Sequence, residues 1–169
     1  MHPAEQLKEE HKNILRGVKL LNITADYMKD GSILQNEIHL LIDFFRSYAD
    51  QGHHAKEEEI FFEYLYKKDE SFKGDFSPIA TFRDDHIRGR KIVSHIERVD
   101  KNYLFRVNDY SMMLNRHIEM EDEIFPMIIE DNLSEIEIQA MSEEFASADA
   151  KRDLASKLSI LDKVEVFLI

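Results

Sequence analysis

Two stretches of the sequence each place a histidine four residues before a glutamate. HHAKEEEIFF begins at His53 and contains Glu57, and HIEMEDEIFP begins at His117 and contains Glu121. The two stretches align with each other without a gap. Residues at i and i+4 share one face of a helix and lie about 6 Å apart along its axis, so each stretch directs an imidazole and a carboxylate toward the same cavity. This pairing is typical of a site for first-row metal ions.

Two more histidines occupy positions that the apolar pattern reserves for the core. His11 lies in EEHKNILRG and His86 in the loosely similar DDHIRGRKI, and each is the one histidine of its apolar stripe. A buried carboxylate without a partner costs several kcal/mol, so core glutamates require a cation or a dense hydrogen-bond network. The pattern H, HxxxE, H, HxxxE therefore predicts a two-metal centre. Its predicted ligands are His11, His53, Glu57, His86, His117 and Glu121.

His54 introduces an ambiguity, because His54 and Glu58 also stand four residues apart. The internal alignment selects His53 and Glu57 as the main pair. His54 lies about 100° further round a regular helix, where it is either a seventh ligand, a group behind the ligands, or a solvated side chain. We include it among the metal-binding residues. The run from Lys56 to Glu59 is expected to combine one core acid with a solvated face, and Arg90 is expected to reach solvent rather than to pair with a nearby acid.

Composition excludes several other classes of function. The chain contains no cysteine, so it has no thiolate ligand or nucleophile, and imidazoles and carboxylates must hold any metal. These ligands favour iron, with manganese or zinc as substitutes. The chain has neither the HExxH motif of zinc proteases nor a phosphate-binding loop. Lys+Arg 22 against Asp+Glu 34 gives a net charge of −12, which repels nucleic acids and anionic membranes. No apolar run approaches the roughly 18 residues of a membrane span, and the charged start does not resemble a secretion signal, so we expect a cytoplasmic protein.

The apolar spacing and the few Gly and Pro residues divide the chain into long helices. The fold class is all-α, an up-down-up-down four-helix bundle over residues 1–132 with a C-terminal helical extension over 133–169 that packs on the bundle or on a partner. Predicted helices cover about 5–28, 32–64, 78–96 and 103–128, followed by a weaker amphipathic tail over about 135–165. Ser32 with Gln35 and Ser134 with Glu137 predict capping boxes, Ser77 and Pro78 predict a helix start after a loop at 68–77, and Pro126 should distort the fourth helix.

Together the four motifs resemble the hemerythrin-like, or HHE cation-binding, family over residues 5 to about 130. The resemblance implies a bundle with a non-haem di-iron centre in which Glu57 and Glu121 bridge two iron ions and the histidines are terminal ligands. It also implies that a small ligand such as O₂, NO or peroxide reacts there, or that the protein senses iron. Oxygen carriers of this family have HxxxH on the third helix and HxxxxD on the fourth. Here the residue four positions after His86 is Arg90 instead of a histidine, and the fourth helix has HxxxE. The resemblance is therefore to the bacterial, archaeal and iron-sensing branches.

Two hypotheses follow. The first is a cytoplasmic di-iron protein, a monomer or homodimer, that binds or reduces O₂, NO or peroxide or senses iron. The second is a helical interaction or regulatory module with a structural or vestigial metal site, whose apolar end at 164–169 contacts a partner protein. An iron-storage oxidase is disfavoured, because one small bundle has no space for mineral.

Overall fold

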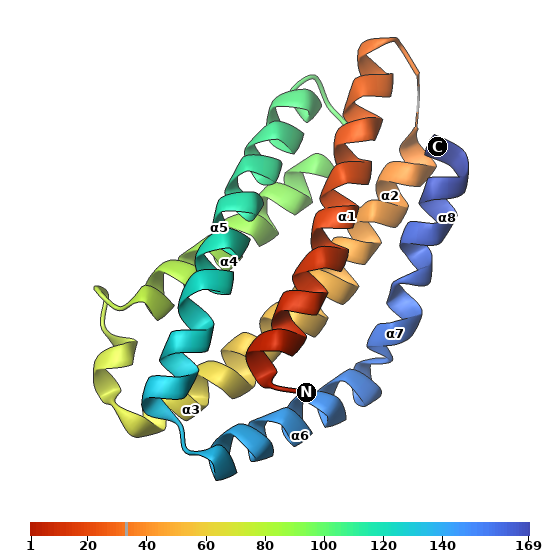
Figure 1. Cartoon of the computed structure of the whole chain (residues 1–169). Helices are drawn as coiled ribbons and strands as arrows, with labels where there is room; N and C mark the ends of the chain where they lie inside the picture. The colour runs from red at the N-terminus through yellow and green to blue at the C-terminus, as the bar shows by residue number, and fades with distance from the viewer. Residues whose placement is uncertain (33) are drawn as a thin grey trace.

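Four long helical segments lie side by side and enclose the core (Figure 1). The computed structural model describes residues 1–32 and 34–169, and this part of the chain is helical with no strand, as the sequence predicts. The segments are α1 (Pro3–Lys29), the run from α2 (Gln35–Phe44) to α3 (Phe62–Lys68), α4 (Pro78–Ile96) and α5 (Tyr103–Asn132). α1 packs against α2 and α5, and α4 packs against α5 and the segment that follows α2, so the segments form a closed ring.

The second segment departs from a regular α-helix at the position of the site. Residues Phe45–His54 (η1) and Glu57–Phe61 (η2) are π-helical, within a run that is otherwise continuous from Gln35 to Lys68. A π-helix is rare, forms hydrogen bonds between residues i and i+5, and occurs frequently at functional sites. Because each turn contains an extra residue, the side chains beyond it point in directions that a regular helical pattern does not predict.

Helix ends follow the predicted signals at two of three positions. Ser77 Oγ accepts a hydrogen bond from the Ile79 N–H at 3.1 Å at the start of α4, and Ser134 forms its capping box with Glu137. The capping box predicted for Ser32 and Gln35 is wrong, because the N-cap of α2 is Leu34. The Ser32 N–H instead donates to the Tyr27 carbonyl, which makes Ser32 part of the turn that ends α1.

Two further predictions concern the loop and the proline. The expected loop at 68–77 contains a short 3₁₀ helix, η3 (Glu70–Lys73). Pro126 lies inside the fourth helix, and α5 continues past it to Asn132, so the distortion expected there stays a prediction.

The C-terminal extension runs back along the outside of the bundle (Figure 1). It consists of α6 (Glu135–Arg152), α7 (Leu154–Lys157) and α8 (Ser159–Leu168). α6 packs against α1 and both π-helices, and α8 packs against α1 and α2. The side chains that it buries there are apolar: Met141, Phe145, Leu154, Leu161, Val164 and Leu168. The extension thus adds a further layer over one side of the ring.

A polar layer divides the core into two apolar clusters. One cluster contains Ile14 of α1 and Leu114 of α5, and the other contains Leu7 of α1 and Phe125 of α5. The predicted metal ligands lie between these positions on both helices. No helix in the described part of the chain combines the length and the apolar character that crossing a membrane requires.

Candidate metal centre

All seven predicted ligands come together in the polar layer between the two apolar clusters. None of these residues is more than 7% exposed. The residues are His11 of α1, His53 and His54 of η1, Glu57 of η2, His86 of α4, and His117 and Glu121 of α5. Every long segment of the bundle therefore contributes at least one imidazole or carboxylate to one buried site.

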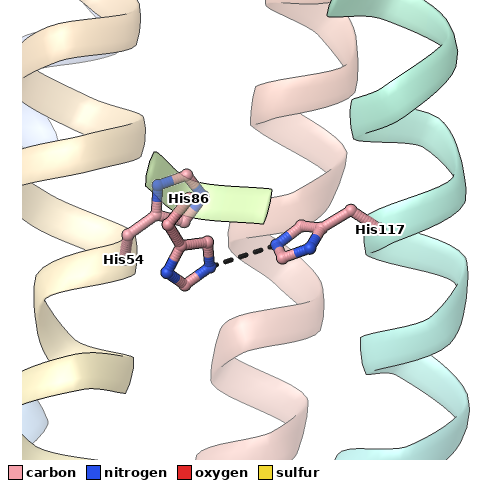
Figure 2. Close-up of side chains that lie close together, drawn as sticks. All are labelled: His54, His86 and His117. Atoms are coloured by element: carbon pink, nitrogen blue, oxygen red, sulfur yellow. Dashed lines mark hydrogen bonds between the residues drawn. The ribbon is translucent and has the colours of Figure 1, made fainter. Parts of the chain in front are cut away.

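The seven side chains form two overlapping groups, each able to hold a metal ion. In the first group, His11 and His53 lie with Glu57 and Glu121, and the potential ligand atoms are within 4.8 Å of one another. In the second, His86 and His117 lie at the same spacing with the same two glutamates. His54 forms a third set with His86 and His117, and Figure 2 shows these three imidazoles approaching one another from three helical segments. We call His11 and His53 the two-imidazole half of the site, and His54, His86 and His117 the three-imidazole half; Glu57 and Glu121 belong to both.

Each glutamate presents one oxygen to each half. Glu57 Oε1 lies 3.1 Å from His53 Nε2, and its Oε2 lies 3.2 Å from His86 Nε2. Glu121 Oε2 lies 3.1 Å from His11 Nε2, and its Oε1 lies 2.9 Å from His117 Nε2. This is the arrangement that a pair of carboxylates needs in order to bridge two metal ions.

The polar atoms of the site fit a bound cation better than they fit one another. The four carboxylate oxygens of Glu57 and Glu121 are fully buried and accept no hydrogen bond of good geometry from the described residues. Nε2 atoms face each other at 3.0 Å between His11 and His53, and at 3.2 Å between His86 and His117. When His11 and His53 are neutral, as metal binding requires, their Nε2 lone pairs oppose each other, and the two carboxylates oppose negative charges. A pair of divalent ions would satisfy all of these donors.

A second row of carboxylates stands behind the imidazoles. Nδ1 of His11 lies 2.7 Å from Asp122, Nδ1 of His53 lies 2.8 Å from Glu10, and Nδ1 of His86 lies 2.7 Å from Glu58. Because an ionised carboxylate only accepts, each of these Nδ1 atoms is the donor, which leaves Nε2 to face the site. Asp85 stands 3.4 Å from Nδ1 of His117 in a less well aligned contact. Such carboxylate–histidine pairs fix the ring orientation of metal ligands and make the ligands more basic.

His54, the last residue of the π-helix η1, also faces the site. Its ring stacks on His86 with 4.0 Å between centroids and an interplanar angle of 17°. Its Nδ1 makes no hydrogen bond, and the nearest carboxylate oxygen, on Asp50, is 3.6 Å away. On a regular helix His53 and His54 would diverge by about 100°, whereas here both are buried at the site.

Arg90 and Lys56 differ in part from the prediction. Arg90 is exposed, as expected, but it also donates to Asp50 at 2.7 Å and to Glu58 at 2.8 Å, so it holds the acids near His54 and His86. Lys56, expected on a solvated face, is 0% exposed. Its ammonium donates to Glu10 and to Asp149 of α6. Asp149 is 93 residues further along the chain, and no pattern within residues 53–62 indicates such a partner.

Electrostatics keep the metal-free site as a network of ion pairs. Burial alone would lower the pKa of His53, but Glu57 and Glu10 raise it to about 9. Burial likewise opposes the charged form of His117, whose pKa is raised to about 9 by Glu121 and Asp85. His54 is the exception, because burial and the positive charge of His86 hold its pKa well below the usual value. The buried carboxylates thus favour the charged forms of His53 and His117, whereas His54 is neutral.

A cavity of about 320 Å³ leads from the three-imidazole half to the surface. Its inner wall is formed by His54, His86 and His117, and its sides by apolar residues such as Tyr110 and Met113 together with charged residues such as Asp50 and Arg90. Gly89 keeps part of it open, since a β-carbon there would lie 3.3 Å from Met113 Cε. The cavity is much larger than the roughly 30 Å³ that one water molecule occupies in the liquid.

Comparison with known proteins gives one match. The family model described as hemerythrin HHE cation binding domain matches residues 2–128. This confirms the resemblance found in the sequence. No curated protein and no solved structure matches the chain. The match ends before the C-terminal extension begins.

Proposed function

The chain belongs to the hemerythrin HHE cation-binding domain family, and on that basis we propose that its seven buried side chains hold two iron ions that bind or react with O₂, NO or peroxide. The observation that carries the proposal is the position of Glu57 and Glu121, each with one oxygen toward either half. Two imidazoles complete one half, and three complete the other if His54 is counted. Manganese or zinc could occupy the same ligands, which are of borderline character.

Iron in this site would supply one-electron redox chemistry and a coordination position for a small ligand. The protein's own groups hold and orient the ligands. Asp122, Glu10 and Glu58 fix three rings through their Nδ1 atoms, and the two apolar clusters exclude water from above and below the polar layer. The cavity gives a small molecule a path to His54, His86 and His117. A protein that senses iron would use the same ligands, because binding to the native state alone stabilises the fold.

The wider setting is part of the same proposal. The ring of four segments with short connections supports an up-down-up-down bundle. The net charge of −12 supports a small uncharged ligand rather than a nucleic acid or a membrane surface. We propose a cytoplasmic protein that acts as a monomer or homodimer.

Metal analysis tests the proposal directly. Protein reconstituted anaerobically with ferrous iron should contain about two irons per chain, and after oxidation it should show charge-transfer absorption in the near ultraviolet. Stopped-flow mixing of the reduced protein with O₂, NO or hydrogen peroxide then identifies the ligand. Protein that takes up no iron, or one zinc and no iron, would exclude the di-iron centre.

The second candidate is an interaction module, and the end of α8 favours it. Val166, Phe167 and Ile169 are at least 69% exposed, whereas Val164 and Leu168 of the same helix are buried against the bundle. Phe167→Ser should leave the fold intact, since the side chain contributes little to the core. A shift from dimer to monomer in analytical ultracentrifugation would support a contact through this end, and an unchanged mass with unchanged metal content would favour the metal function alone.

A further inference from the structure

Lys56 is a fully buried cation that does not contact the metal ligands directly. Its side chain is 0% exposed, and its ammonium also lies 5.5 Å from the centre of the Phe145 ring of α6. It donates to Glu10 of α1 and, at 2.6 Å, to Asp149 of α6. An isolated buried ammonium costs several kcal/mol, so this lysine depends on both carboxylates.

These contacts form a continuous chain from the C-terminal extension to a ligand. Asp149 Oδ1 accepts from Lys56, Glu10 Oε1 accepts from Lys56, and Glu10 Oε2 lies 2.8 Å from His53 Nδ1. The other oxygen of Asp149 accepts from the Gln6 amide at 2.8 Å, which fixes its position. Glu10 thus divides its two oxygens between the lysine and the histidine. If Asp149 were lost, one of the two carboxylates that fix the Lys56 ammonium would be gone, and Lys56 would no longer fix the Glu10 carboxylate in its position against His53.

A second contact of the extension reaches the same π-helix independently. Leu154 of α7 lies over Gly52, so closely that a β-carbon at Gly52 would be 2.2 Å from Leu154 Cδ1. Gly52 immediately precedes His53 and His54. The extension therefore touches η1 both through the charged chain and through an apolar contact beside the two histidines.

We propose that the C-terminal extension is a positioning element of the metal centre, in which Asp149 holds Lys56 so that Glu10 can orient His53. The inference rests on the proposed metal site. It assigns to Asp149, which lies outside the region matched by the family model, a role in the affinity of the two-imidazole half for its metal ion. Asp149 and Lys56 are positioning residues, because each acts through Glu10 and neither faces the metal ligands.

Titration of metal-free protein with Co²⁺, followed by visible absorption, tests this role. Asp149→Asn should weaken one of the two binding events by about tenfold, the lower end of the range for residues behind metal ligands, and leave the other unchanged. Lys56→Met should weaken the same event. Because Asp149 acts through Lys56, adding Asp149→Asn to Lys56→Met should cause no further loss. The matched control is Asp162→Asn, which removes another carboxylate of the extension, paired at the surface with Arg16.

The outcomes separate this inference from the metal site itself. Wild-type protein that binds no metal would refute the proposed function. Wild-type protein that binds two ions, together with an Asp149→Asn variant identical to Asp162→Asn, would refute only the role of the extension. Equal weakening of the binding of both ions, or additive losses of affinity in the double variant, would show a general packing effect. Either result would also refute the role of the extension. If Asp149→Asn does not fold without metal, Gln6→Leu keeps both charges and should weaken the same ion to a smaller degree.

Discussion

Replacing His54 with phenylalanine distinguishes a metal ligand from a packed ring. The His54 side chain is 7% exposed, stacks on His86 at 4.0 Å, and carries an Nδ1 atom with no hydrogen bond. Phenylalanine keeps an aromatic ring in the stack and removes both ring nitrogens. The substitution should therefore change the stability of the metal-free and metal-bound proteins in opposite directions.

The magnitudes follow from the surroundings of the ring. An unsatisfied buried polar atom costs about 1–3 kcal/mol, and the larger ring costs about 1 kcal/mol in overpacking. Metal-free His54→Phe should therefore be up to about 2 kcal/mol more stable than wild type, and at about 2–4 °C per kcal/mol its Tm should rise by up to about 8 °C. In the metal-bound protein the three-imidazole half loses a donor. A loss of affinity of about 100-fold corresponds to about 2.7 kcal/mol.

Calorimetry of the metal-free and Co²⁺-loaded proteins measures both effects, and metal analysis gives the ions bound per chain. His39→Phe is the matched control, since His39 is exposed and lies outside the site. The gain in Tm on adding metal should shrink in His54→Phe and stay at the wild-type value in His39→Phe. A full metal-dependent gain in His54→Phe would refute the assignment of His54 as a metal ligand.

Other predictions concern the two glutamates that face both halves, the protonation of the histidines, and the entry of small ligands through the cavity. Glu57→Gln and Glu121→Gln should each reduce the content of both metal ions, measured by mass spectrometry, because each carboxylate faces both halves; loss of a single ion would contradict bridging. With pKa values of about 9, His53 and His117 contribute stability to the metal-free protein that is complete below about pH 6.5 and lost as the pH rises through about 9. The Tm of the metal-free protein should fall across this pH window while the affinity for metal rises. Protons should be released when metal is added, and pH-stat measurement checks this direction. Gly89→Leu should slow azide binding to the metal-loaded protein about tenfold in stopped flow, equivalent to about 1.4 kcal/mol, by narrowing the cavity; an unchanged rate would indicate another route.

Much of the architecture could be predicted from local sequence signals. The apolar spacing predicts the long helices because burial of one face stabilises each of them, and ionisable residues within that spacing mark the site. His11, His86, and the pairs His53 with Glu57 and His117 with Glu121 stand out for this reason. Ser77 caps α4 as predicted, because its signal involves only neighbouring residues.

Other features depend on geometry that sequence spacing does not contain. His54 lies in a π-helical segment, and a helical pattern with a fixed period cannot predict where such a segment occurs. Lys56 is buried because Asp149, far along the chain, lies beside it. Ser32 has the residue type of a cap, but its backbone closes the preceding helix instead. Each difference comes from contacts between segments or from a departure from regular helix geometry.

The π-helical turns also determine how this protein can be aligned with its relatives. A π-turn contains one residue more than an α-turn, so it behaves as an insertion inside a helix whose ends remain in place. Deleting a single residue within η1 should rotate every side chain before the deletion relative to those after it. Alignments of this segment with relatives that have a regular helix therefore require a gap within the helix, where gaps are ordinarily penalised. A search for other proteins that supply an imidazole at the position of His54 should allow that gap.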